Sequence, residues 1–130
     1  MKVNKIIVKT PTKNYNILIG SNILKNIPKI LINNNINFQK CLIVVDKNIP
    51  KKFKSQLIKS LKYKKKFIYL FNATEKNKCY KSIEIIQNIL FKNRFNREDC
   101  VISFGGGITG DVVGFASSIY KRGLKYINIP

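Results

Sequence analysis

The stretch from Cys100 to Pro130 changes its residue pattern three times, and it constrains the fold more tightly than the rest of the chain. A short apolar run over residues 100–104 leads into glycines, and apolar residues then recur with helical spacing over residues 112–119. Gly123 closes that segment, and polar and apolar residues alternate over residues 124–129. The stretch predicts a strand, a glycine turn, a helix and a second strand.

Gly105, Gly107 and Gly110 fit the G-x-G-x-x-G spacing of dinucleotide-binding turns. Such glycines let the backbone approach a pyrophosphate and point the free N–H groups of a helix start toward it. The spacing is weak evidence by itself, because the acidic residue expected about 20 positions later would fall beyond Pro130. The carboxylate of Asp111 suits a helix start but would repel a phosphate, so we expect it to face a hydroxyl, an amide or another metal-free polar group.

Four further segments predict strands. An apolar-rich run over residues 3–8 and an alternating run over residues 15–19 indicate an opening β-hairpin. The runs over residues 41–45 and 67–71 are continuously apolar, which is typical of strands covered on both faces.

Between these runs, apolar residues with helical spacing predict helices near residues 24–31, 51–61 and 83–90. Pro28 is expected to end or kink the first helix unless that helix begins there. The alternation of strands and helices predicts an α/β fold, with a Rossmann-like parallel sheet, helices on both faces and an amino-terminal β-hairpin.

Asp46 and Asn48 directly follow the strand predicted over residues 41–45. Ligands of open parallel sheets bind outside the carboxyl ends of the strands, so either side chain could contact a ribose or an adenine. Alternatively, one of them only caps the helix predicted over residues 51–61, and the spacing alone favours the cap.

The composition is that of one domain of 130 residues, large enough to bury about two thirds of its unfolded surface. The chain has no 18-residue apolar run and no export leader, so we expect a cytoplasmic protein without membrane contact. It has no histidine, and its three cysteines lack C-x-x-C spacing, so we expect no metal site. Cys41 and Cys100 open apolar runs and are expected to be buried thiols.

The net charge of +19 would ordinarily suggest a nucleic-acid partner. Here the basic residues are 22 lysines and only 3 arginines, and the chain also holds 22 isoleucines and 16 asparagines. This skew fits a bias toward A/T-rich codons, and the lysines are spread along the whole chain. We therefore do not expect nucleic acid as the partner, although the charge should attract anionic ligands.

A larger motif surrounds the glycines. Phe104 to Asp111, Gly114-Phe115-Ala116, Tyr120, Arg122-Gly123 and Ile129-Pro130 together resemble the signature of 3-dehydroquinate synthases, a family of sugar-phosphate cyclases. The polyol dehydrogenases that share this fold resemble only its first half. The resemblance implies that residues 1–130 form the NAD-binding amino-terminal domain and end before the metal-binding helical domain of the family.

The resemblance also implies roles for particular residues. Arg122 is similar to the substrate-binding arginine of the family. The implied cofactor-binding residues are Asp46, Asn48, Lys81, Gly105, Gly106, Gly107, Ile108, Gly110 and Asp111. Lys81 comes from Tyr80-Lys81-Ser82, which resembles the end of a Gly-Glu-x-x-Lys-Ser element in the loop expected over residues 74–82; an ordinary surface lysine is the equally weighted alternative.

Two adjacent positions depart from the family pattern. The Gly-Glu pair of that element would fall on Asn77 and Lys78, so a cation replaces the acidic partner of a ribose diol. Glu75 could take over that role if the loop is rebuilt. The departure leaves the affinity for the cofactor open.

In the family, a phosphorylated seven-carbon keto acid loses phosphate and closes into a carbocycle, in the shikimate pathway that leads to chorismate and the aromatic amino acids. Bound NAD⁺ oxidises one hydroxyl transiently, and a divalent metal, zinc or cobalt, polarises it. The resemblance places the metal ligands and most catalytic residues in the carboxyl-terminal domain, so we expect neither catalytic residues nor metal ligands in this chain.

Three interpretations follow. The first is the NAD-binding half of a 3-dehydroquinate synthase, inactive alone, with a phosphorylated sugar-acid substrate, a carboxyl-terminal domain or separate chain as partner, and a possible homodimer. The second is half of a polyol or glycerol dehydrogenase, which gives no reason for Arg122-Gly123. The third is a non-enzymatic, basic, anion-binding remnant, for which binding of nucleic acid would depend steeply on salt.

Overall fold

The computed structural model describes residues 3–130. Its elements alternate along the chain much as the sequence predicts. In order they are β1 (Val3–Lys9), β2 (Asn14–Gly20), α1 (Ile23–Asn33), β3 (Lys40–Asp46), α2 (Lys51–Ser60), β4 (Lys65–Phe71), a 3₁₀ turn (Glu75–Asn77), α3 (Tyr80–Lys92), β5 (Cys100–Phe104), α4 (Gly107–Ile119), a 3₁₀ turn (Tyr120–Arg122) and β6 (Lys125–Ile129).

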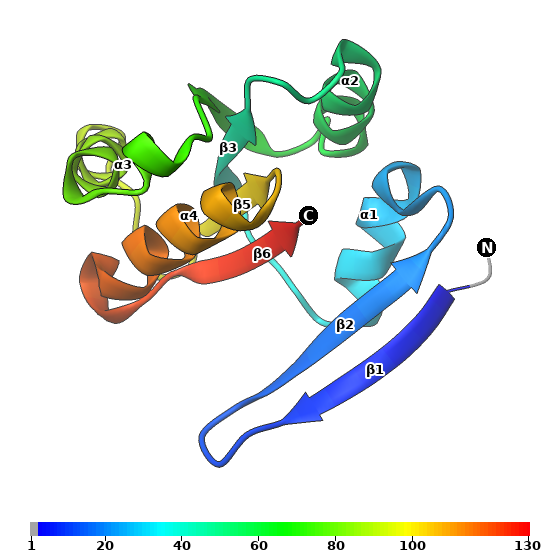
Figure 1. Ribbon diagram of the computed structural model, residues 1–130. Helices are drawn as coiled ribbons and strands as arrows, with labels where there is room; N and C mark the ends of the chain where they lie inside the picture. The colour runs from blue at the N-terminus through cyan, green and yellow to red at the C-terminus, as the bar shows by residue number, and fades with distance from the viewer. Residues whose placement is uncertain (1–2) are drawn as a thin grey trace.

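The central sheet contains four parallel strands in the order β4-β3-β5-β6. Helices α3 and α4 cover one face and helices α1 and α2 cover the other (Figure 1). The inner strands β3 and β5 are buried almost throughout, as expected for continuously apolar runs. The predicted α/β fold with helices on both faces is confirmed, and the carboxyl ends of all four strands meet at one edge.

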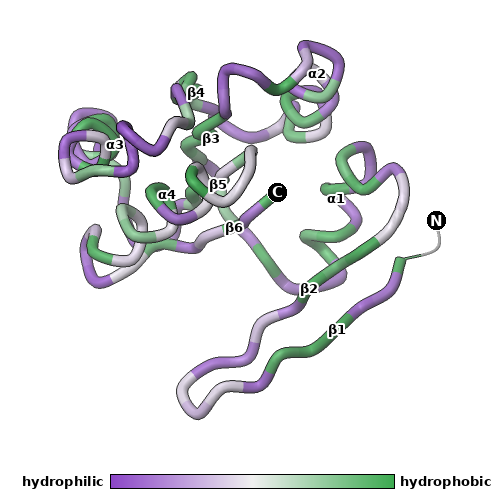
Figure 2. Tube along the Cα trace, viewed as in Figure 1, coloured by the Kyte–Doolittle hydropathy of each residue, from purple (hydrophilic) through white to green (hydrophobic). Residues whose placement is uncertain are grey.

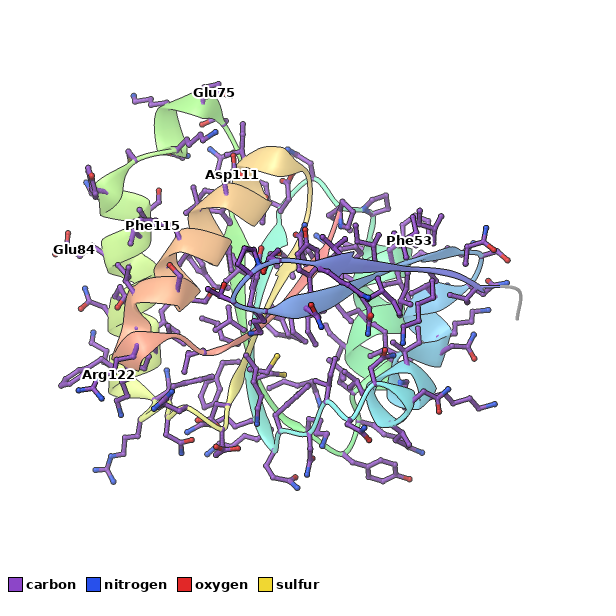
Figure 3. The ribbon with its side chains drawn as sticks, turned by 90° about the horizontal axis from the view of Figure 1, so that it is seen from below. Phe53, Glu75, Glu84, Asp111, Phe115 and Arg122 are labelled. Carbon is purple, nitrogen blue, oxygen red and sulfur yellow. The ribbon has the colours of Figure 1, made fainter. Side chains whose placement is uncertain are left out.

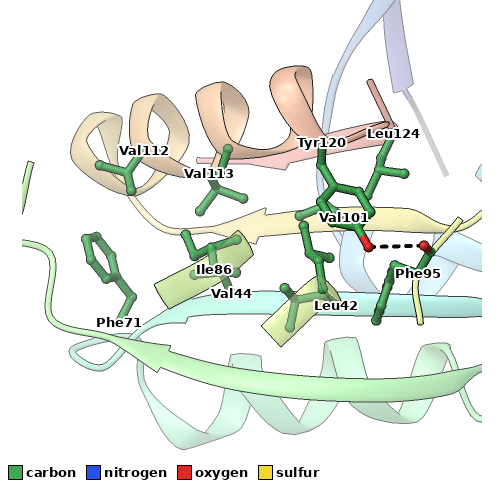
Figure 4. Close-up of a cluster of buried hydrophobic side chains, with 12 residues drawn as sticks. Leu42, Val44, Phe71, Ile86, Phe95, Val101, Val112, Val113, Tyr120 and Leu124 are labelled. Atoms are coloured by element: carbon green, nitrogen blue, oxygen red, sulfur yellow. Dashed lines mark hydrogen bonds between the residues drawn. The ribbon is translucent and has the colours of Figure 1, made fainter. Parts of the chain in front are cut away.

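The core between the sheet and helices α3 and α4 fixes the position of α4. Val112, Val113 and Ala116 of α4 pack with Val44 and Val101 of the sheet (Figure 4). Beyond the end of α4, the buried Tyr120 hydroxyl donates a hydrogen bond of 3.2 Å to the Phe95 carbonyl (Figure 4). This packing holds the start of α4 over the carboxyl ends of β3 and β5.

The amino-terminal strands form the predicted hairpin, and this hairpin is separate from the central sheet (Figure 1). The middle segments of both strands are apolar (Figure 2). Five large apolar side chains of the hairpin are nevertheless between 41% and 57% exposed: Ile6, Ile7, Tyr15, Ile17 and Ile19. A two-stranded hairpin with so little covered surface contributes little stability by itself.

One local feature of the first helix differs from the expectation. Helix α1 runs through Pro28, so the proline does not end this helix. The buried Ile27 and Leu31 lie on either side of Pro28, so packing against the sheet compensates for the missing backbone hydrogen bond. None of the helices within residues 3–130 is both long and apolar enough to cross a bilayer.

The cysteines give a direct test of the core. Cys41 and Cys100 are fully buried, as predicted, and burial raises the pKa of the Cys41 thiol to about 11. Cys79 is exposed, and hydrogen bonding to Ser82 lowers its pKa, so more of it is thiolate at neutral pH.

These environments predict the reactivity of the three thiols. We expect iodoacetamide to alkylate one cysteine per native chain, Cys79, at pH 7.5 and all three in urea, as measured by mass spectrometry. Rapid native alkylation of Cys41 would contradict this packing.

Candidate functional site

A sharp turn joins β5 to α4 at the carboxyl edge of the sheet. Gly105, its first residue, has a φ of +156° and donates a hydrogen bond of 3.0 Å from its N–H to the Ile129 carbonyl. A Cβ on Gly105 would lie 2.7 Å from Thr109 Oγ1 and 2.8 Å from the Asp46 Cβ. Only glycine fits here, because the backbone passes directly between β3 and the first turn of α4.

The next two glycines face open space. A Cβ on Gly106 or Gly107 would meet no atom within 4 Å, and both residues are exposed. Gly106 is the N-cap of α4 and supplies no side-chain cap, so the first N–H groups of the helix have no side-chain acceptor. This bare backbone at a helix start suits an anionic group.

Thr109 lies beneath this open surface. Its hydroxyl oxygen is fully buried and has no hydrogen-bond partner within residues 3–130. The hydroxyl oxygen lies 2.7 Å from the position that a Cβ on Gly105 would take. A buried, unpartnered hydroxyl below a bare helix start marks a site whose polar groups are incomplete without a further partner.

Asp46 and Asn48, the cofactor-binding residues predicted at the end of β3, lie in one turn. Asp46 is the last residue of β3, and its Oδ1 accepts a hydrogen bond of 3.0 Å from the Asn48 N–H. The N-cap of α2 is Pro50, so the alternative that Asp46 or Asn48 caps this helix is wrong. Asp46 closes the turn after β3 instead, next to Gly105.

The loop between β4 and α3 reaches the same edge of the sheet. Lys78 donates a hydrogen bond of 2.8 Å from Nζ to Asp111 Oδ2 on α4. Lys81 was expected in the loop, but it lies in the first turn of α3, which begins at Tyr80. The helix start predicted from the sequence was too late, because most of the first turn of α3 is exposed and the apolar pattern begins only at Ile83.

Arg122 lies away from this turn. Helix α4 separates Asp111 at one end from Arg122 beyond the other (Figure 3), and its 13 residues span roughly 20 Å. Lys121 and Arg122 both have positive φ, as has Gly123. The glycine turn and Arg122 therefore lie at opposite ends of α4.

Arg122 instead belongs to a second, basic pocket of about 400 Å³. Its lining comes from the hairpin loop, the segment before β5 and the segment between α4 and β6: Lys13, Arg97, Glu98, Arg122, Gly123, Leu124 and Lys125. Glu98 is the one acidic residue among these, and it pairs with Lys125 at 2.9 Å. The remaining cations leave this pocket suited to an anion.

A polar cluster supports the glycine turn from below, and sequence reasoning missed it. The Ser103 hydroxyl lies 2.6 Å from Asn128 Oδ1 and 2.8 Å from the Tyr126 hydroxyl, which donates a hydrogen bond of 2.9 Å to the Gly110 carbonyl. Burial raises the pKa of Tyr126, so the hydroxyl remains a donor. Ser103, inside a buried apolar strand, was the one available signal.

No group of three or more His, Cys, Asp or Glu side chains within residues 3–130 is arranged to hold a metal ion. At this edge of the sheet, the bare start of α4 is accompanied by the carboxylates of Asp46 and Asp111 and the ammonium group of Lys78. This arrangement can hold an anionic group against backbone amides and accept hydrogen bonds from hydroxyl groups beside it.

Solved structures with this fold define its class. The fold matches 2-deoxy-scyllo-inosose synthase, solved with carbaglucose-6-phosphate, NAD⁺ and Co²⁺, with a TM-score of 0.86 and 20% identity over 98% of this chain and 35% of that one. It also matches the 2-epi-5-epi-valiolone synthase of Streptomyces hygroscopicus subsp. jinggangensis 5008, solved with NAD⁺ and Zn²⁺, with a TM-score of 0.65 and 26% identity over 72% of this chain and 27% of that one. The fold is that of sugar-phosphate cyclases.

Sequence comparison finds relatives of this chain among 3-dehydroquinate synthases. Residues 68–130 match the family model described as 3-dehydroquinate synthase N-terminal. Over its whole length the chain is 54% identical to the 3-dehydroquinate synthase of Pelagibacter ubique (strain HTCC1062), of which the match covers 35%. It is 38% identical to the 3-dehydroquinate synthase of Prochlorococcus marinus subsp. pastoris (strain CCMP1986 / NIES-2087 / MED4), of which the match covers 37%. The chain is thus a homologue of the amino-terminal part of 3-dehydroquinate synthases, and the resemblance seen in its sequence is confirmed. It spans about a third of the length of these relatives.

Proposed function

We propose that this chain supplies the NAD-binding part of a 3-dehydroquinate synthase, the lyase that converts 3-deoxy-D-arabino-heptulosonate 7-phosphate to 3-dehydroquinate and phosphate. The observation that carries the proposal is the open backbone of Gly106 and Gly107 at the start of α4. It lies where parallel sheets bind nucleotides, at the carboxyl ends of the strands. The 54% identity to a 3-dehydroquinate synthase supports the same assignment.

The residues around the turn fit a dinucleotide. The diphosphate would rest on the backbone of Gly105 to Ile108, where no side chain intervenes at Gly106 or Gly107. Asp46 and Asp111 offer carboxylate oxygens to ribose hydroxyls or a carboxamide, and we propose that Asn48 and Lys81 donate hydrogen bonds to the same ligand. Gly110 lets the helix pack closely on Asn128, since a Cβ there would lie 3.2 Å from its Oδ1.

NAD⁺, when bound, supplies a transient oxidation in the proposed reaction, and this chain contributes binding and orientation. The described residues do not fit a divalent metal, because no three suitable ligands come together among them. We propose that the metal ligands and the catalytic groups lie outside residues 3–130, and that this chain is inactive alone. Arg122 is proposed to bind the substrate, from the basic pocket at the other end of α4.

Binding of NAD⁺ should raise the stability of the chain. A ligand that binds only the folded state stabilises it by mass action, by about 2.7 kcal/mol when its concentration is 100 times its dissociation constant. We expect 1 mM NAD⁺ to raise the urea midpoint, measured by tyrosine fluorescence or circular dichroism. Asp111→Ala should reduce the shift more than Lys13→Ala, because Lys13 lines the pocket at the far end of α4.

A parallel titration with sodium pyrophosphate separates this proposal from simple anion binding. A basic remnant without a nucleotide site would be stabilised as much by pyrophosphate as by NAD⁺, and salt would abolish both effects alike. The absence of any shift at millimolar NAD⁺ would count against the proposed function.

A further inference from the structure

Lys78 and Asp111 form an exposed ion pair near the start of α4, which carries the proposed dinucleotide site. Nζ and Oδ2 are 2.8 Å apart, and the side chains are 46% and 62% exposed. Of the three ion pairs among residues 3–130, this one connects the loop before α3 with α4. Glu75 in Figure 3 marks that loop at the same end of α4 as Asp111.

The position of Asp111 creates an electrostatic conflict. Asp111 is the fifth residue of α4, so its carboxylate lies one helical turn from the bare amides of Gly106 and Gly107. A negative charge there repels any diphosphate bound to those amides. Thr109, in the same first turn, has a buried hydroxyl without a hydrogen-bond partner among the described residues.

Lys78 resolves this conflict in two ways. Its ammonium cancels the charge of Asp111, and the hydrogen bond to Asp111 raises the pKa of Lys78, so the ammonium stays charged at neutral pH. The bond also uses Oδ2 alone. Oδ1 makes no hydrogen bond within residues 3–130, so it can accept one from a ligand hydroxyl or amide.

We propose that Lys78 is a positioning residue of the dinucleotide site, which holds the Asp111 carboxylate in place and neutralises its repulsion of the diphosphate. The inference rests on the proposed function. It also gives a role to the residue that replaces the acid of the family pattern, since in this proposal Lys78 acts on the cofactor through Asp111.

A double-mutant cycle on the full chain tests the inference, with NAD⁺ affinity measured by isothermal titration calorimetry. We expect Lys78→Ala to weaken binding roughly fivefold to tenfold at low salt, and less at 0.5 M NaCl, because the exposed carboxylate is then screened. In the Asp111→Asn background, the same change should weaken binding less than twofold, since no carboxylate remains to be held or neutralised. Lys78→Arg should retain most of the affinity, because it keeps the ion pair.

Lys76→Ala is the matched control, because Lys76 is an exposed lysine of the same loop without an ion pair among the described residues. It should bind NAD⁺ like the unchanged chain, and melting curves should show that every variant folds. An equal loss from Lys78→Ala in both backgrounds would mean that Lys78 contacts the ligand directly and would overturn the inference. Unchanged affinity of Lys78→Ala would also overturn it while leaving the proposed function intact. If the unchanged chain fails to bind NAD⁺, the proposed function fails first.

Discussion

Gly105→Ala is expected to destabilise the folded chain by about 3 kcal/mol, the largest effect of any single methyl group in the glycine turn. The new Cβ would lie 2.8 Å from the Asp46 Cβ and 2.7 Å from Thr109 Oγ1, at a φ of +156° that side chains rarely adopt. The Asp46 Cβ is attached directly to β3, so relief requires movement of the backbone. Urea denaturation followed by circular dichroism measures the loss.

Gly106→Ala provides the control for this prediction. Its methyl group would meet no atom within 4 Å, so the unfolding free energy should change by less than about 1 kcal/mol. Equal stability of the two variants would mean that β3 and α4 are not packed against Gly105 as the structure shows. Because Asp46 borders Gly105, Gly105→Ala should also displace Asp46, a residue that is proposed to contact the cofactor.

The parts of the fold that depend on local periodicity could be predicted from the sequence. The buried strands were recognisable because β3 and β5 are covered on both faces and therefore consist of apolar residues alone. The helix expected near residues 51–61 is α2, Lys51–Ser60, since its apolar stripe spans its full length. The start of α3 was missed because an exposed first turn carries no apolar signal.

The arrangement of the site depended on tertiary contacts, and the sequence predicted it only in part. The glycine spacing indicated a turn, but it could not show that Gly105 serves packing while Gly106 and Gly107 face open space. A helix of 13 residues places the turn and Arg122 at opposite ends, a separation that follows from the helical rise alone.

The ion pair between Lys78 and Asp111 could not be predicted from the sequence. The two residues lie 33 positions apart, and no local pattern connects them. In the sequence, Lys78 appeared only as a cation where the family pattern has an acid. The structure shows that Lys78 faces Asp111, so the lysine that replaces the acid of the family pattern balances the charge of a second carboxylate.

Gly107→Ala is expected to separate binding from folding. Gly107 is the first residue of α4 and has no positive φ, so alanine fits the backbone, and its better helix propensity should leave stability unchanged or slightly raised. The methyl group would project into the open space over the helix start, where a diphosphate needs close contact with the amides. Affinity for NAD⁺ should therefore fall by about tenfold or more, as measured by calorimetry beside a urea melt of the same sample.

The contrast with Gly105→Ala makes this result specific. Both substitutions add one methyl group to the same turn, yet one methyl meets protein atoms and the other meets none. Loss of affinity without loss of stability at Gly107 would locate the diphosphate on the first turn of α4. Full affinity in Gly107→Ala would place the ligand elsewhere, because a dinucleotide resting on these amides cannot share their surface with a side chain.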